Sequence, residues 1–158
     1  MFLAYINDLP NCLSNSTPAL FADDTNVTVT GTSFQDIEAK LNGELNNLHC
    51  WLLTNRLTLN ASKSEYMLIG SRKRLSRIDI DPHVFINNQI IDRVDNTKTL
   101  GVFIDENITW KTHINHVCKQ MFKGIGVLRR AKRMISNASL ERLFKALVLP
   151  HFDYCSLV

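Results

Sequence analysis

The chain has 158 residues, enough for about one domain with a real hydrophobic core. Hydrophobic residues make up 45% of it and charged residues 21%, which is ordinary for a globular protein and excludes general disorder. No run approaches the roughly 18 apolar residues of a membrane span, and the opening lacks the basic start of a signal peptide. We therefore expect an intracellular protein, nuclear or cytoplasmic, with no membrane partner. Its four cysteines are expected to be reduced and buried: Cys12, Cys50, Cys118 and Cys155.

The net charge of +3 hides an uneven distribution. Residues 1–70 carry three basic and seven acidic side chains, a balance of −4, and residues 71–110 balance at zero. Residues 111–158 carry nine Lys or Arg side chains against two acidic ones, a balance of +7. The basic tail fits either a polyanionic partner or a helix whose charged face is simply solvated, and the acidic front fits a cation.

The first clear pattern is "ALFADDTNVTVT" at residues 19–30. "ALFA" is typical of a short buried strand, "DDTN" of a turn, and "VTVT" of a strand with Val27 and Val29 on one face. Asp23 and Asp24 are therefore expected at the tip of a hairpin. Two adjacent carboxylates repel each other, so this tip fits either a divalent cation such as Mg²⁺ or an aspartate-rich turn in water.

A helix is predicted next, within residues 32–57. Ser33 is a candidate N-cap, with Asp36 three residues later. Apolar residues recur at spacings of three and four, which indicates an amphipathic helix with one buried face. These apolar residues are Phe34, Ile37, Leu41, Leu45, Leu48 and Leu52.

The middle of the chain predicts short strands at residues 66–70, 83–87, 89–94 and 97–104, which we expect to form an antiparallel sheet. From Trp110 the spacing becomes helical again, and a last helix is expected over 138–149, kinked or ended by Pro150. The order indicates an α+β fold, with a sheet-based part at 1–105 and a helical part at 106–158. The expected apolar stripe of the first of these helices is Trp110, Ile114, Val117, Met121, Ile125 and Leu128, and the basic residues mostly away from it are Lys119, Lys123, Arg129, Arg130 and Arg133.

Five segments in order resemble the reverse transcriptases of non-LTR, jockey-like retrotransposons. "FADDT" resembles their catalytic [FY]ADD box, and "FLAYINDLP" resembles the stretch that precedes it. "LTLNASKSEYMLIGS" resembles the LNxxK segment, "TKTLGVFIDENITWKTHI" the LGV strand, and "LFKALVLPHFDYCS" a thumb-side stretch. Together these segments span residues 2–156.

The resemblance implies a partial polymerase palm at 1–105, an antiparallel sheet with a packed helix, and a truncated thumb-like helical region at 106–158. It implies that Asp23 is the main ligand of two Mg²⁺ ions and Asp24 its neighbour. Lys63 would lie near the incoming deoxynucleotide triphosphate, and Leu100 and Gly101 on the hairpin that steadies the primer end. The residues implied to contact the phosphates of an RNA template and DNA primer are Lys119, Lys123, Arg129, Arg130 and Arg133.

Plainer roles stay open for several of these residues. Lys63 also fits a surface lysine, and Leu100 and Gly101 also fit strand positions in a core. The basic segment 72–77, with Arg72, Lys73, Arg74 and Arg77, fits either a second phosphate contact or a solvated loop. The side chains of His113, His116 and Cys118 lack a fourth ligand at zinc spacing, so we expect packing or surface roles for them.

Two features of the family are missing from the sequence. A complete reverse transcriptase has a further metal-binding aspartate on an earlier palm strand and a QG-containing helix that checks the incoming nucleotide. We therefore expect a fragment that is inactive without the upstream palm and fingers of the same polymerase. A non-catalytic nucleic-acid-binding module, and a retroelement remnant with no function of its own, remain as alternatives.

Overall fold

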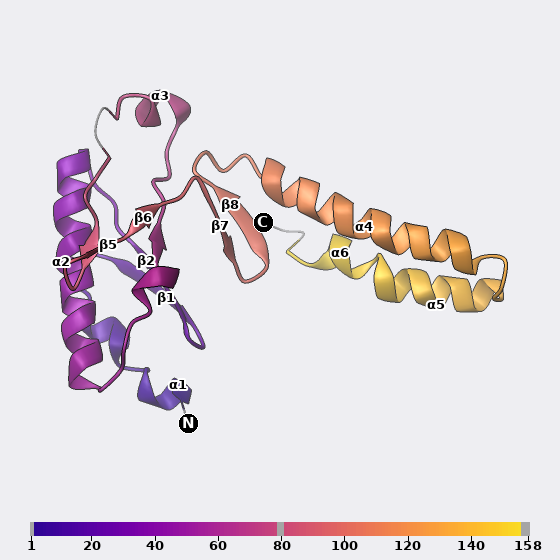
Figure 1. Cartoon of the computed structure of the whole chain (residues 1–158), viewed down its shortest axis with the longest axis horizontal. Coiled ribbons are helices and arrows are strands. Elements are labelled where there is room, and N and C mark those ends of the chain that lie inside the picture. Colours follow the sequence, from indigo (N-terminus) through magenta and orange to yellow (C-terminus); the bar gives the residue numbers. More distant parts are fainter. Residues whose placement is uncertain (1, 79–80, 156–158) are drawn as a thin grey trace. The chain divides into compact units, whose positions relative to one another are not determined.

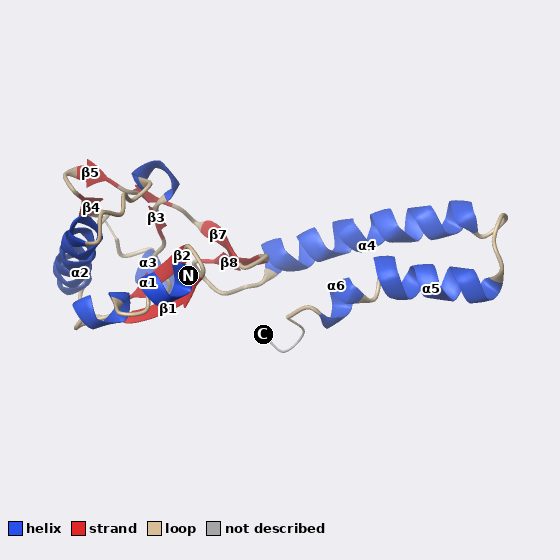
Figure 2. Ribbon diagram, turned by 90° about the horizontal axis from the view of Figure 1, so that it is seen from below, coloured by secondary structure: helices blue, strands red, loops and turns tan. Residues whose placement is uncertain are grey.

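The chain folds into two compact units, Met1–Val94 and Asp95–Val158, in a computed structural model that describes residues 2–78 and 81–155. Figure 1 follows the elements along the sequence, and Figure 2 shows the same elements as helices and strands. The boundary lies earlier than residue 105, because the hairpin that follows residue 94 packs on the next helix. None of the helices in the described part of the chain is long and apolar enough to cross a membrane.

The first unit packs one long helix against short strands. The helix is α2 (Phe34–Thr54), and the hairpin that precedes it is formed by β1 (Thr17–Phe21) and β2 (Asp24–Thr28). The other elements of this unit have only two to four residues each. They are α1 (Phe2–Tyr5), η1 (Leu9–Cys12), η2 (Ala61–Lys63), β3 (Glu65–Tyr66), α3 (Arg72–Leu75), β4 (Phe85–Ile86), β5 (Gln89–Ile90) and β6 (Asp92–Arg93).

Helix α2 begins at the predicted cap. The Ser33 hydroxyl accepts a hydrogen bond from the backbone N–H of Asp36 at 3.1 Å, and the Asp36 carboxylate accepts one from the N–H of Thr32 at 3.1 Å. These bonds satisfy donors that have no partner inside the first turn. The predicted apolar face is also confirmed, with Leu48 and Leu52 buried and Phe34, Ile37, Leu41 and Leu45 half-buried.

Two clusters of buried side chains form the core of the first unit, and α2 contributes to both. Leu45 and Leu59 pack against both clusters and so connect them. Each fully buried leucine or isoleucine contributes about 1.5–3 kcal/mol, so this apolar face is the main attachment of α2. The cluster residues are Leu9, Leu48 and Leu52 in one, and Val84, Ile86 and Ile91 in the other.

The second unit is a hairpin followed by helices. Its elements are β7 (Asn96–Thr99), β8 (Val102–Asp105), α4 (Lys111–Ala131), α5 (Asn137–Leu147) and α6 (Pro150–Asp153). Helices α4 and α5 lie side by side in both views (Figures 1 and 2). Pro150 is the first residue of the short helix α6. An N–H at this position would have no partner within the helix, so proline, which lacks an N–H, costs no hydrogen bond there.

Helices α4 and α5 are in close contact at Gly124. A Cβ there would lie 2.9 Å from the carbonyl oxygen of Leu147, so a larger residue would push the helices apart. Val117 and Leu128 are half-buried on the same side of α4, as predicted. Ile114 is 56% exposed, so its predicted place in the packed stripe is wrong.

The single antiparallel sheet expected in the middle of the chain is not what forms. The strands of the described residues make four separate two-stranded sheets, and β3 and β6 pair in parallel. Side-chain hydrogen bonds take the place of a continuous backbone ladder here. The side-chain amide of Asn42 in α2 donates to the carbonyl of His83 at 2.8 Å and accepts from the N–H of Phe85 at 3.1 Å. The Tyr66 hydroxyl likewise donates to the carbonyl of Pro82 at 2.8 Å.

The cysteines are free thiols, and two of them contradict the expected burial. Cys50 and Cys118 are exposed, because they lie on the outward sides of α2 and α4. Cys12 and Cys155 are half-buried, and burial raises the pKa of the Cys12 thiol.

Candidate functional site

The paired aspartates lie at the tip of a tight hairpin, as predicted. Phe21 pairs with Asp24, so Ala22 and Asp23 form a two-residue turn and Asp24 is already the first residue of β2. Ala22 has a φ of 52°, in the left-handed region that side chains other than glycine seldom adopt. A two-residue hairpin turn needs a positive φ to match the twist of its strands, and alanine adopts it with some backbone strain.

The two faces of this hairpin differ in burial. Pro18, Leu20 and Val27 lie on one face and are half-buried, and Leu20 packs on the cluster around Leu48. The opposite face is exposed and carries Phe21 and Asp24, with Phe21 62% exposed. Because partners in an antiparallel register share a face, the aspartate and the aromatic ring stand next to each other.

Both aspartates at the tip are open to solvent and to an incoming cation. Asp23 and Asp24 are exposed, and neither carboxylate forms an ion pair with a described residue. Among the described residues, no three His, Cys, Asp or Glu side chains lie close enough together to hold a metal. The tip therefore offers two hard oxygen donors, which fits Mg²⁺, an ion that binds through one or two carboxylates and keeps water and phosphate as its other ligands.

A buried carboxylate holds the base of the hairpin on α2. Glu44 is only 2% exposed and accepts hydrogen bonds from the N–H groups of Ser14 at 3.0 Å and Asn15 at 3.1 Å. The hydroxyls of Ser16 at 2.7 Å and Ser14 at 3.2 Å donate to it as well. Residues 14–16 lead directly into β1, so this one side chain fixes the start of the hairpin to the helix.

The hydrogen bonds also set the charge state of Glu44. Burial on its own would raise the pKa of this carboxyl, but the donors of Ser16, Asn15 and Ser14 together outweigh burial and hold the pKa below its ordinary value. The side chain is therefore a buried anion at neutral pH, stabilised by dipoles and not by a cation.

Lys63 ends the short helix η2, and its side chain is exposed. Asn60 shapes the turn that carries it, because its carbonyl accepts from the N–H of Lys63 at 3.1 Å and its side chain accepts from Ser62 at 2.7 Å. No hydrogen bond or ion pair joins Lys63 to the two aspartates. The exposed surface role thus stays open beside the predicted one.

Leu100 and Gly101 form the turn of the β7–β8 hairpin. Thr99 pairs with Val102, so these two residues are the whole loop, with φ values of 49° and 85°. Two positive φ values match the strand twist of a tight hairpin, and glycine allows the second at no steric cost. Both residues are exposed, so the alternative of core strand positions is wrong. The Tyr154 hydroxyl donates to the carbonyl of Leu100 and so braces the turn.

The loop between β8 and α4 is organised by Asp105. Its carboxylate accepts from the N–H of Thr109 at 3.0 Å and of Trp110 at 3.1 Å, and from the Thr109 hydroxyl at 3.0 Å. These bonds, above all the one from the Thr109 backbone, hold the pKa of Asp105 below its usual range. They also stabilise Trp110 in a left-handed conformation with a φ of 61°.

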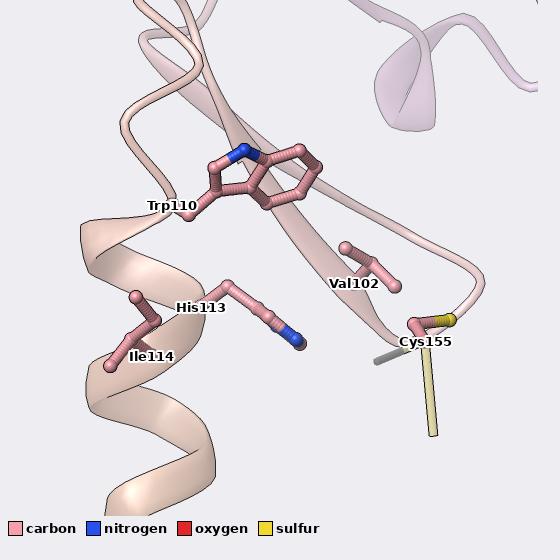
Figure 3. Close-up of a pocket in the computed structure, with 5 residues that line it drawn as sticks. All are labelled: Val102, Trp110, His113, Ile114 and Cys155. Atoms are coloured by element: carbon pink, nitrogen blue, oxygen red, sulfur yellow. The ribbon is translucent and has the colours of Figure 1, made fainter. Parts of the chain in front are cut away.

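A small pocket lies beside this loop in the second unit. Figure 3 shows Trp110 and His113 reaching from the start of α4 toward Val102 of β8, with Ile114 and Cys155 completing the lining. Its volume of about 200 Å³ is below that of ordinary ligand pockets, which begin at about 300 Å³, so we assign it no ligand.

The two histidines near the start of α4 have packing roles. The Nδ1 of His113 accepts from the N–H of Phe103 at 3.4 Å, and the ring of His116 lies with its centroid 4.9 Å from that of Phe103. Cys118 points outward and is exposed. These contacts place the histidines against the hairpin, as expected from the missing fourth zinc ligand.

The predicted phosphate-binding side chains are all exposed. Lys119, Lys123, Arg129 and Arg130 lie on α4, and Arg133 follows its end. None of the five forms an ion pair with a described residue. The second basic candidate, around α3, is exposed too, with Arg72, Lys73, Arg74 and Arg77.

Two further residues of interest were not predicted. Glu44 could have been found, because it lies three residues after Leu41 and four before Leu48, where the apolar spacing leaves no place for a charge. Phe122 lies among the basic residues of α4 and is 71% exposed. The sequence signal for it was a large apolar side chain outside the predicted apolar stripe.

The chain is similar to a polymerase of a mobile element. Over 139 residues it is 24% identical to the RNA-directed DNA polymerase from mobile element jockey of Drosophila funebris, a match that covers 86% of this chain. The chain spans about 15% of the length of that relative. The similarity supports a reverse-transcriptase-like relationship, while no family profile and no solved structure matches the chain.

Replacing Glu44 by its neutral isostere tests the anchor of the hairpin. We expect Glu44→Gln to lower the free energy of unfolding of the first unit by about 1–3 kcal/mol at pH 7, because the buried donors lose a charged acceptor. This difference in the free energy of unfolding between the variant and the parent chain should disappear on acidification. The pKa of the Glu44 carboxyl is lower in the folded chain than the value of about 4.3 expected in the unfolded chain. Its carboxylate therefore stabilises the folded state above the unfolded pKa, and this contribution is lost as the pH falls through the folded pKa.

Urea unfolding at pH 7 and at pH 3, followed by the fluorescence of Trp51 in a Trp110→Phe background, measures this difference. Asp92→Asn removes one exposed carboxylate elsewhere in the same unit and serves as the matched control. A deficit of equal size at both pH values would contradict the assignment of Glu44 as a buried anion.

Proposed function

We propose that this chain is the palm-to-thumb part of an RNA-directed DNA polymerase of a mobile element. The observation that carries the proposal is the tip of the β1–β2 hairpin. There, Asp23 and Asp24 are exposed and without ion-pair partners among the described residues, next to a strained Ala22. The similarity to a jockey polymerase supports it, because the match covers most of the chain.

In this proposal the two carboxylates hold Mg²⁺ for nucleotidyl transfer. When bound, the ions would activate the primer hydroxyl and neutralise the charge that develops on the departing pyrophosphate. Asp23, in the turn itself, would be the main ligand, and Asp24 would contribute from the start of β2. A third carboxylate would come from an upstream palm strand of the same polymerase, so this chain is proposed to be inactive on its own.

The other residues would position the reactants. Lys63 would place its charge near the pyrophosphate of the deoxynucleotide triphosphate, and the Leu100–Gly101 turn would lie along the primer strand, where the lack of a side chain on glycine allows a close approach. Glu44 would act through the hairpin that it holds, as a positioning residue.

The second candidate function is nucleic-acid binding without catalysis. It is favoured by one specific observation, that the 21 residues of α4 include five Lys or Arg and no Asp or Glu. A helix of this composition keeps a positive potential along its length, which suits a phosphate backbone. The proposed substrate in either case is a nucleic acid, with an RNA template and DNA primer in the first.

A chimera tests the catalytic proposal. The matching segment of the jockey polymerase would be replaced by this chain, and primer extension on an RNA template would be measured. We expect the chimera to extend the primer and Asp23→Asn to abolish extension, because losing a metal ligand removes most of the transition-state stabilisation in phosphoryl transfer.

Asp92→Asn, in the same unit but away from the tip, is the control and should extend normally. The 158-residue chain by itself should show no extension. Equal extension by the chimera with and without Asp23→Asn would sink the proposed role of the hairpin.

The salt dependence of binding tests the role of α4. We expect the combined replacement of Lys119, Lys123, Arg129, Arg130 and Arg133 by alanine to flatten the log–log salt slope for duplex binding by about 0.9 per lost phosphate contact. Sequence preference should not change, because phosphate contacts do not read bases. The measurement is fluorescence anisotropy with a labelled RNA–DNA duplex over a salt series.

Replacement of the four basic residues of segment 72–77 by alanine is the control for the loss of charge, with four charges removed against five. If the salt slope for duplex binding flattens in that variant but not in the α4 variant, the phosphates are bound around α3 and the assignment to α4 is wrong.

A further inference from the structure

The basic side chains of α4 gather on the side of the helix that faces away from α5. Helix residues turn by about 100° each, so Lys119, Lys123 and Arg130 fall within a narrow stripe about 120° around the helix from Gly124, the residue that contacts α5. Arg129 flanks the stripe, and all four side chains are exposed. We call this set, together with Phe122 and Gly126, the outer face of α4.

A large aromatic ring stands in the middle of this outer face. Phe122 is 71% exposed and lies between Lys119, one turn before it, and Arg129, two turns after it. Residues three and four apart are neighbours on a helix, so Lys119 borders the ring on its N-terminal side, while Arg129 lies about 10 Å along the axis on the other side. A single exposed apolar residue is common, but one that stands beside cations on a helix without any acid has a particular chemical environment.

The next turn leaves the ring of Phe122 uncovered. Side chains on a helix lean toward its N-terminus, so a side chain at position 126 would lie over Phe122. Position 126 is glycine, and a Cβ built there would have no atom within 4 Å. The surface beside the ring is therefore open space, and a flat group could stack there.

We propose that Phe122 stacks on an unpaired nucleobase of a strand whose phosphates are held by Lys119, Lys123, Arg129 and Arg130. This inference rests on the proposed nucleic-acid binding by α4 and adds the strandedness of the ligand. In a duplex the base faces are covered by their neighbours, so the ring could reach a base only where a strand is single. Open aromatic rings along a cationic track are how proteins bind single strands without reading sequence.

Three ligands test the stacking; the two single strands have the same backbone charge, and the duplex has about twice as much. They are a labelled single strand of about 12 thymidines, an abasic strand of the same length, and a duplex of that length, within the usual site sizes of about 4–16 nucleotides. With the full chain, Phe122→Ala should weaken thymidine-strand binding by about 5- to 150-fold, as expected for one stacked base. Binding of the abasic strand and the salt slope should not change, and Phe122→Trp should restore the affinity.

Met134→Ala is the matched control, because Met134 is 85% exposed, apolar, and close to the end of the same helix. It should bind all three ligands like the parent chain. Phe122→Ala removes no buried contact and puts a good helix former in an exposed position, so far-UV circular dichroism should be unchanged.

The outcomes separate this inference from the proposed function. One outcome is that the parent chain binds with the expected salt slope and Phe122→Ala binds the thymidine strand as tightly as the parent chain. The stacking role is then wrong, but phosphate binding by the outer face of α4 stands. The same outcome is expected if Phe122 contacts a protein. An equal loss on thymidine and abasic strands would likewise overturn stacking. If the parent chain binds none of the three ligands, both the inference and the role of α4 in nucleic-acid binding fall.

Discussion

The placement of the β1–β2 hairpin depends on one buried anion. Glu44 lies on the inner side of α2, is almost fully removed from water, and accepts hydrogen bonds from Ser14, Asn15 and Ser16. A carboxylate in this position is stable only when donors surround it, so the backbone of residues 14–16 must stay close to the helix. Residues 17–28 follow directly as the hairpin, and its exposed tip is thereby placed by an interaction at its base.

Two groups of exposed charges, one at the hairpin tip and one on α4, form no ion pair with a described residue. The hairpin tip places two carboxylates together without a cation, and α4 carries five basic side chains without an acid. Like charges held together cost free energy in water, even if only about 3 kcal/mol for two carboxylates about 5 Å apart near a surface. An external partner of opposite charge would relieve both arrangements, and in the proposed function these partners are a divalent cation for the first and a polyanion for the second.

Local features of the fold could be predicted from the sequence because their causes are local. The Ser33 cap and the apolar face of α2 each follow from residues within a few positions of one another. The pattern of residues 97–104 predicted one continuous strand, which the Leu100–Gly101 turn divides into β7 and β8. The role of Glu44 could not be predicted in this way, because its donors lie about 30 residues earlier in the chain. The division into four small sheets was missed for a related reason, since Asn42 and Tyr66 anchor strands through side chains and so limit the backbone ladders.

The candidate site residues also differ in whether a local sequence pattern could identify them. Asp23 and Asp24 were found because a turn between two strand patterns has a clear signature, and the register Phe21 to Asp24 bears it out. Phe122 was missed because a helical stripe identifies what is buried and treats everything else as solvated surface. Its significance came only with the packing, once Gly124 showed which side of α4 faces α5.

The most direct test of the account is where a divalent cation binds. Mn²⁺ is a paramagnetic substitute for Mg²⁺ that prefers the same oxygen ligands, and it broadens the NMR signals of amides close to it. Titrated into the isotopically labelled chain, Mn²⁺ should broaden the amide signals of Ala22, Asp23 and Asp24 first, and Asp23→Asn should remove that preference. Broadening that begins at other exposed acids such as Asp81 or Asp92, or that spreads evenly over the acidic residues, would contradict a cation site at the hairpin tip.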